Sequence, residues 1–241
     1  MRKNKFLANL KAGRKTSVCQ LYFPSATVVE LIGLAGLDCV LFDGEHGTFT
    51  PQDLDDLCRV AELGGLDIIA RVPEISSSTI QSYLDRGVMG IFGPGVDTKE
   101  DAQRLVDACR YAPIGKRGIG GAPRWLQYGN IASRAQIEEA NSELLVAAFL
   151  EHVDALDNLD DIMSVEGIDA YYVGPADMSL SLGLPGELDH PRVKEVENTV
   201  RKAALARGKC YLGDGIAGVR ATNMFLDGAK LFLEANRAAL S

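Results

Sequence analysis

Short apolar segments recur along the chain at intervals that predict eight strands. Each is rich in β-branched or aromatic residues and is four to eight residues long, as buried strands are. The segments are residues 18–23, 39–42, 67–71, 88–92, 144–151, 169–173, 209–212 and 230–233. Between most of them the apolar positions follow a helical spacing instead. Apolar strands that alternate with amphipathic helices indicate a parallel sheet covered by helices.

Two of the intervening segments carry clear helix signals. Thr50 can cap a helix that begins at Pro51, where the missing N–H would have no partner in any case. Thr98 stands in the same position before a second helix. The residues that form one apolar face at the spacing i, i+3, i+4 and i+7 are Leu54, Leu57, Cys58 and Ala61 in the first helix, and Ala102, Leu105, Val106 and Cys109 in the second.

Eight such repeats favour a closed (β/α)8 TIM barrel over an open, doubly wound sheet. The chain has 241 residues, a length that one α/β barrel commonly fills. No linker, low-complexity tract or shift of composition divides it, so we expect a single domain over residues 1–241. The longest irregular stretch, residues 112–130, holds a Gly-Gly pair and the only tryptophan, Trp125. Such long loops are usually functional or disordered, and we expect this one to be a mobile segment that covers a site.

Composition and charge narrow the choice of partners. Apolar residues make up 46% and charged residues 24%, an ordinary globular mix. The net charge of −8 argues against nucleic acid or an anionic membrane as a partner, but not against a small anionic substrate. No apolar run approaches the roughly 20 residues of a membrane span, and the basic N-terminus lacks the apolar centre of a secretory signal. The five cysteines are odd in number and far apart, which predicts reduced thiols and a cytoplasmic protein.

Ionisable side chains follow several predicted strands at the point where each strand ends. In a barrel the carboxyl ends of the strands carry the chemistry. The residues are Asp43, Glu45 and His46 after the second strand, Arg71 at the end of the third, Glu151 at the end of the fifth, and Asp177 after the sixth. Each has a plain structural alternative: a solvated turn for the first three, an ion-pair partner for Arg71, simple solvation for Glu151 and a helix cap for Asp177. Their placement at one end of the sheet favours a common site.

Glu151 and Asp177 are candidate ligands for a divalent metal ion. Two carboxylates leave several coordination positions to water and substrate, which suits Mg²⁺ or Mn²⁺. Zn²⁺ usually takes more nitrogen or sulfur ligands, and it remains an alternative together with Co²⁺. Beside such an ion Arg71 would stabilise an oxyanion, and Asp43 could orient the ring of His46 for acid–base work.

The motifs around these residues resemble those of the HpcH/HpaI class II pyruvate aldolases, which include 4-hydroxy-2-oxoheptanedioate and 2-dehydro-3-deoxyglucarate aldolases. The matching segments are "FDGEHGTFT", "ARVPE", "YLDRGVMGIFGPGV", "YAPIGKRGIGG", "FLEHVDALDNLDDIMSVEGIDAYYVGPADMSLSLG" and "DHPRV". They run in order from about residue 4 to about residue 228. The resemblance implies a (β/α)8 barrel of the phosphoenolpyruvate/pyruvate type. It also implies a lyase that reversibly cleaves a 4-hydroxy-2-oxo acid to pyruvate, or a related 2-oxo acid, and an aldehyde.

The resemblance also assigns roles to individual residues. Glu151 and Asp177 would ligate the metal, Arg71 would stabilise the pyruvate enolate, and His46 with Asp43 would serve the acid–base step. The backbone around Gly174 and Ala176 would receive the pyruvate carboxylate. Asp85 in "YLDRG" matches a family aspartate that reaches a neighbouring subunit's site, so the resemblance implies a homo-oligomer, either a trimer or a hexamer.

Two other functions stay open at this stage. A metal-dependent lyase of another kind, such as an oxaloacetate decarboxylase, would keep the same site, and a non-catalytic barrel could bind a keto acid or a protein partner. None of the predicted strand ends carries a lysine, so a metal mechanism is preferred over a Schiff base. Arg124 and Trp125 on the long loop, and Leu212 at the end of the seventh strand, are candidates for contacting the aldehyde half. Arg124 could equally be a solvated loop charge.

Overall fold

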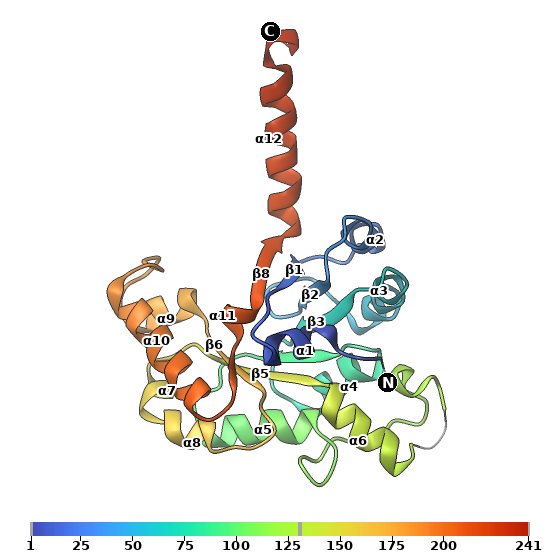
Figure 1. The fold of residues 1–241 in the computed structure, drawn as a ribbon, viewed down its shortest axis with the longest axis vertical. Helices are drawn as coiled ribbons and strands as arrows, with labels where there is room; N and C mark the ends of the chain where they lie inside the picture. The colour runs from blue at the N-terminus through green and yellow to red at the C-terminus, as the bar shows by residue number, and fades with distance from the viewer. Residues whose placement is uncertain (1, 130–131, 241) are drawn as a thin grey trace.

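Eight parallel strands form one curled sheet in the computed structural model, which describes residues 2–129 and 132–240 (Figure 1). The ladder runs in the order β7-β6-β5-β4-β3-β2-β1-β8, so the last strand pairs with the first. The strands are β1 (Thr16–Leu21), β2 (Cys39–Asp43), β3 (Asp67–Arg71), β4 (Gly90–Gly93), β5 (Leu145–Leu150), β6 (Ala170–Val173), β7 (Cys210–Tyr211) and β8 (Ile216–Arg220). This order confirms a parallel α/β sheet. Among the described residues, no ladder joins β7 to β8.

Helices alternate with the strands and cover the outside of the sheet (Figure 1). The first half holds α1 (Lys5–Lys11), α2 (Ala26–Leu34), α3 (Pro51–Leu63), α4 (Ser77–Asp85) and α5 (Lys99–Cys109). A 3-10 turn, η1 (Arg124–Leu126), and α6 (Arg134–Glu143) follow. The rest comprises α7 (Asp154–Asp157), α8 (Leu159–Met163), α9 (Pro175–Ser181), α10 (Pro191–Ala206), α11 (Leu212–Gly215) and α12 (Ala221–Leu240). Both predicted caps are confirmed, since Thr50 and Thr98 form capping boxes with Asp53 and Asp101.

The first helix closes the amino end of the sheet. Asn4 caps α1 and donates through Nδ2 to the carbonyl oxygens of Met89, 2.8 Å away, and Glu143, 2.9 Å away. Both acceptors lie just before a strand, β4 and β5 respectively. The Phe6 N–H donates to Asp67 Oδ2 at 2.6 Å, at the start of β3. The Phe6 ring is fully buried among residues of the inner face of the sheet, so α1 acts as a plug that ties three strands together.

The eighth predicted strand, residues 230–233, is wrong. These residues lie inside α12, and the strand that pairs with β1 is Ile216–Arg220. A four-residue apolar run fits a strand or a helix equally well by periodicity. The flanking sequence contains no proline and is rich in Ala, Leu and other helix formers, so the helix runs through it. The true strand escaped notice because Gly218 and Arg220 interrupt its apolar pattern.

We expected the long loop to cover a site, but it does not cover the carboxyl end of the sheet. Arg117 is buried, pairs with Asp85 at 2.9 Å and stacks over the ring of Tyr111, with its guanidinium carbon 4.6 Å from the ring centroid. Trp125 packs against the same tyrosine, with ring centroids 5.7 Å apart. The loop is therefore anchored to the end of α4. Asn130, its last residue, lies outside the described residues.

No described helix is both long enough and apolar enough to span a lipid bilayer. The five cysteines are all free, and four of them are buried. Burial raises the pKa of the Cys19 thiol to about 11 and that of Cys58 to about 12. These thiols are therefore uncharged packing groups at neutral pH.

The plug role of α1 predicts a large loss of stability for Phe6→Ala. Truncating a fully buried phenylalanine should lower the free energy of unfolding by about 3–5 kcal/mol, because the lost burial is joined by the cost of a cavity. Urea denaturation followed by circular dichroism measures this. Leu34→Ala on α2 is the matched control, since Leu34 is 78% exposed and should change stability by no more than about 0.5 kcal/mol. Equal effects of the two substitutions would contradict the plug.

Candidate active site

A cavity of about 660 Å³ opens at the carboxyl end of the sheet. Residues from β1, β3, α9, α11 and β8, and from the segments after β2, β5 and β6, line it. Seven of the residues singled out in the sequence contribute to its wall: His46, Arg71, Glu151, Gly174, Ala176, Asp177 and Leu212. The structure thus brings together residues that are more than 160 positions apart in the chain.

Asp43 lies behind this wall, fully buried, and holds Arg71 in place. Arg71 Nε donates to Asp43 Oδ1 at 3.0 Å, and its Nη2 forms a second, shorter bond to Oδ2. Gln20 Nε2 donates to Oδ2 at 2.7 Å and the His46 main-chain N–H to Oδ1 at 3.1 Å. Burial works to raise the pKa of the Asp43 carboxyl, but the hydrogen bonds and positive charge of Arg71 outweigh it and lower the pKa. Asp43 is therefore a charged and fully hydrogen-bonded carboxylate.

Arg71 presents its remaining side to the cavity. Its Nη1 lies 3.0 Å from Glu45 Oε2. Burial works to lower the pKa of Arg71, but the carboxylates of Asp43 and Glu45, together with the more distant Glu151, raise it. The guanidinium is thus a fixed positive charge between buried and cavity-facing acids.

The ring of His46 does not contact Asp43 as the sequence led us to expect. Asp43 reaches His46 through the main chain, and the imidazole Nε2 instead lies 3.8 Å from Glu45 Oε2. The His46 side chain is 56% exposed, so the ring is free to meet a ligand. Gly44 permits this tight turn, because a Cβ there would collide with Tyr83 Oη and lie 2.9 Å from the Arg71 carbonyl oxygen. Glu45 belongs to the same "DGEH" segment and was expected at this end of the sheet, but no role was assigned to it from the sequence.

Glu151 and Asp177 bring negative charge to the same cavity from the ends of β5 and β6. Glu151 Oε2 accepts a hydrogen bond from the Gly95 N–H at 2.9 Å. Burial raises the pKa of Glu151, and the charges of Glu45 and Asp177 raise it further. Gly174 admits this carboxylate, because a Cβ there would lie 2.8 Å from Glu151 Cγ and 2.9 Å from Oε1.

This arrangement fits a hard divalent cation. Two acids that repel each other are stabilised by a cation between them, and Mg²⁺ is typically held by one or two carboxylates while it keeps several waters. No group of three or more His, Cys, Asp or Glu side chains that could enclose a metal occurs in the described part of the chain. The pair therefore matches an open site with free coordination positions rather than a closed structural zinc site.

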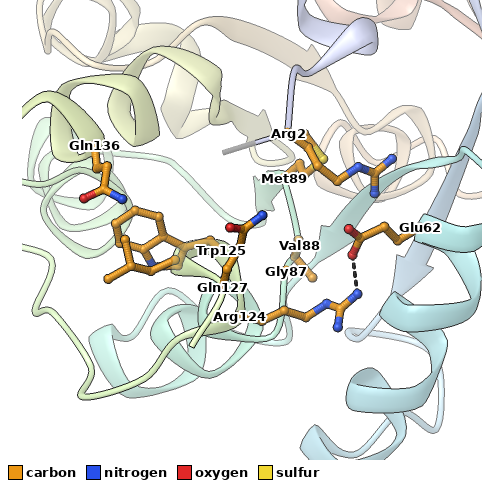
Figure 2. Close-up of a pocket in the computed structure, with 10 residues that line it drawn as sticks. Arg2, Glu62, Gly87, Val88, Met89, Arg124, Trp125, Gln127 and Gln136 are labelled. Atoms are coloured by element: carbon orange, nitrogen blue, oxygen red, sulfur yellow. Dashed lines mark hydrogen bonds and ion pairs between the residues drawn. The ribbon is translucent and has the colours of Figure 1, made fainter. Parts of the chain in front are cut away.

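Three predicted site residues lie elsewhere. Asp85, at the end of α4, pairs with Arg117 and does not line this cavity. Arg124 and Trp125 line a second cavity of about 240 Å³, where Arg124 forms an ion pair with Glu62 (Figure 2). Its walls include Arg2 and the residues just before β4, so it lies at the amino end of the strands. Within this chain, Arg124 and Trp125 therefore cannot contact a ligand at the carboxyl end.

Sequence reasoning also missed several residues that line the main cavity. Gln20 and Tyr22 come from β1 and the residue that follows it, and Arg220 comes from β8. A single amide within the apolar run "SVCQLYF" was the available signal for Gln20. Part of the wall is aromatic, with the Phe149 ring centroid 5.2 Å from that of Phe92 and 4.9 Å from that of Tyr172. Unlike Gln20, Arg220 could not be identified from the sequence, because the eighth strand had been predicted at the wrong place.

The chain matches known proteins over most of its length. Residues 18–236 match the family model described as HpcH/HpaI aldolase/citrate lyase. A 2-keto-3-deoxy-L-rhamnonate aldolase of Escherichia coli K12 is 38% identical over 208 residues, which cover 86% of this chain and 77% of the relative. The family expected from the motifs is therefore confirmed by an independent comparison.

Solved structures agree with this result. A crystal structure of an HpcH/HpaI aldolase from Desulfitobacterium hafniense DCB-2 superposes with a TM-score of 0.83 at 28% identity, covering 94% of this chain and 96% of that one. The crystal structure of citrate synthase SbnG gives a TM-score of 0.84 at 25% identity and covers 98% of both chains. With the acids, arginine and histidine gathered at one cavity, these matches show that the chain belongs to the HpcH/HpaI aldolase/citrate lyase family and is a carbon–carbon lyase of the metal-dependent aldolase type.

Proposed function

We propose that the cavity at the carboxyl end of the sheet cleaves a 2-keto-3-deoxy sugar acid, a 4-hydroxy-2-oxo acid, to pyruvate and a hydroxyaldehyde. The observation that carries this proposal is that the acids Glu151 and Asp177 line the same cavity as Arg71 and His46. The relative from Escherichia coli is named for a substrate of this class. Cleavage of that acid between C3 and C4 would release pyruvate and 2-hydroxypropanal.

Glu151 and Asp177 would hold the divalent ion, and Mg²⁺ or Mn²⁺ suits their oxygen ligands best. Such an ion supplies Lewis-acid polarisation of the 2-oxo group and charge neutralisation for the substrate carboxylate. The wall formed by Gly174 and Ala176 lies beside both acids and is proposed to receive that carboxylate.

Arg71 and His46 supply the remaining chemistry. Cleavage takes the proton from the C4 hydroxyl, breaks the C3–C4 bond and moves its electron pair toward the former 2-oxo oxygen. Arg71 places a permanent positive charge where this negative charge develops, and Asp43 keeps the guanidinium from turning away. His46 has an exposed ring next to Glu45 and can accept the hydroxyl proton.

We further propose that the chain works as a homo-oligomer, with a trimer or a hexamer as the expected state. Helix α12 leaves the body of the molecule and extends away from it (Figure 1). It exposes a set of large apolar side chains: Met224, Phe225, Leu226, Leu231, Phe232 and Leu233. Side chains of this size on one projecting helix favour burial against another copy of the chain. Asp85 would then act at a neighbouring subunit's site, in line with the family resemblance.

The remaining expectations stay predictions. A closed (β/α)8 barrel would need β7 and β8, the two edge strands of the ladder, to pair with each other. A single domain over residues 1–241 and a cytoplasmic location belong to the same proposal.

Substituting a proposed metal ligand tests the reaction directly. Glu151→Gln should lower pyruvate release from a 2-keto-3-deoxy acid by at least about 100-fold in the presence of Mg²⁺ or Mn²⁺, because a neutral amide is a poor ligand for a hard cation. The assay couples pyruvate to its reduction by a dehydrogenase. Glu166→Gln, on the exposed surface, is the control and should keep full activity. Wild-type turnover that survives chelation would refute the metal assignment.

The raised pKa of Glu151 also predicts an effect on stability that needs no substrate. A group whose pKa is raised by folding stabilises the protein most when it is protonated, and this contribution is lost as the pH rises through the folded pKa. In metal-free buffer, Glu151→Gln should therefore unfold at a higher urea concentration than the wild type at pH 7.5, and the difference should vanish near pH 4. Added Mg²⁺ should stabilise the wild type more than the variant. A variant less stable than the wild type at pH 7.5 would contradict the argument.

Light scattering coupled to size-exclusion chromatography measures the assembly. The wild type should elute with a mass of three or six times the 25.9 kDa chain. Replacing Phe225 and Phe232 together by serine should shift the mass toward the monomer without changing the circular dichroism spectrum, since both side chains are more than half exposed. A wild-type monomer at micromolar concentration would overturn the proposed oligomer.

A further inference from the structure

Gln20 occupies a part of the cavity wall to which no role has been given. It lies on β1, paired with Leu41 of β2 on one side and with Arg220 of β8 on the other. Four places separate β1 from β5 in the ladder of eight strands, so Gln20 faces the cavity from the side opposite Glu151. Its side chain is partly buried.

The hydrogen bond to Asp43 fixes which way the Gln20 amide points. Asp43 is charged and can only accept hydrogen bonds, so the group 2.7 Å from its Oδ2 must be the amide NH₂. The amide carbonyl therefore points the other way. No described residue donates a hydrogen bond to Oε1. This oxygen is also not one of the fully buried polar atoms that lack a partner, so it is accessible. Gln20 thus shows the cavity an accessible acceptor whose orientation is locked from behind by Asp43.

The position of this acceptor relates to the shape of the substrate. If the proposed function holds, the pyruvate half lies against Glu151 and Asp177, and Arg71 and His46 flank the reacting carbons. The aldehyde half must then extend into the remaining sector, which β1, α11 and β8 enclose. Leu212 is almost fully buried and apolar there, so it offers no hydrogen bond. Gln20 offers an acceptor next to the Arg71–Asp43 pair, and hence next to the bond that breaks.

We propose that Gln20 determines the selectivity for the aldehyde half, an inference that rests on the proposed function. Its Oε1 accepts a hydrogen bond from a hydroxyl group on the carbon next to the aldehyde carbon. A carbonyl oxygen forms a hydrogen bond with a donor at this position. It forms none with a hydrogen atom or an alkyl group bound to the same carbon. The favoured acceptor aldehydes are therefore 2-hydroxyaldehydes.

The test compares two aldehydes that differ only in this hydroxyl. In the synthetic direction, wild-type and Gln20→Met proteins combine pyruvate with either 2-hydroxypropanal or propanal, and kcat/KM is measured for each. Methionine keeps the size of glutamine but accepts no comparable hydrogen bond. The preference for 2-hydroxypropanal, taken as the ratio of its kcat/KM to that of propanal, should fall about 3- to 10-fold, the range of one neutral hydrogen bond.

A second readout separates selectivity from support of Arg71. Exchange of the pyruvate methyl protons with deuterated water, followed by NMR, reports enolisation without any aldehyde. It should change less than about threefold in Gln20→Met. Equal losses for both aldehydes and for exchange would mean that Gln20 only positions Asp43, and an unchanged preference would show that it recognises nothing; either result overturns the inference.

Two further outcomes complete the design. Gln20→Asn keeps an amide on a side chain one methylene shorter and should also lose part of the preference for 2-hydroxypropanal. It replaces Gln20→Met in the comparison if the methionine variant does not fold. A wild-type protein that shows neither proton exchange nor aldol addition would overturn the proposed function itself. A failure of the Gln20 inference alone would leave both wild-type reactions intact.

Discussion

The active end of this molecule depends on the buried ion pair between Asp43 and Arg71. The two residues stand opposite each other at the ends of β2 and β3, so the pair joins neighbouring strands at the point where the cavity begins. A buried ion pair adds to stability only when its hydrogen-bonding groups are satisfied, and removing one partner leaves a costly charge behind. Asp43 meets this condition because Arg71, Gln20 and the His46 N–H all donate to it. One carboxylate thus orders β1, the guanidinium and the histidine turn together.

The charges across the cavity are arranged for ligand binding rather than for maximal stability. Arg71 lies close to the carboxylates of Asp43 and Glu45, whereas Glu151 is partly buried near two other acids. The Gly95 N–H is its direct hydrogen-bond donor. An acidic cluster of this kind opposes folding until a cation enters. Local conflict of this sort is expected where a site has been shaped for function, because stability and chemistry make different demands on the same residues.

The sequence predicted the convergence of the site better than its internal contacts. Parallel strands share one direction, so Arg71, Glu151 and the polar groups after β2 and β6 had to meet at one edge of the sheet. Which atoms then touch depends on the turn at Gly44, and sequence spacing alone cannot tell a main-chain contact to His46 from a ring contact. Arg124 lies away from this cavity within the chain because a long loop can return to either end of the strands, and this one returns to the amino end.

Because the long loop is anchored away from the cavity, other segments bound the mouth. Leu188 before α10, and Asn223 and Asp227 in the first turns of α12, line it together with Arg220. Of these, Arg220 pairs directly with Gln20 in the β1–β8 ladder. In the proposed function, the environment of the aldehyde half would therefore depend on how α12 begins, and the pyruvate half would lie against the residues that follow β5 and β6. Arg110 ties the starts of these two strands together through the Leu144 and Gly167 carbonyls and Asp169. In the proposed function, the half of the substrate common to all 2-oxo acids would thus lie beside strands that Arg110 ties together, and the variable half would lie at the edge where the sheet ends.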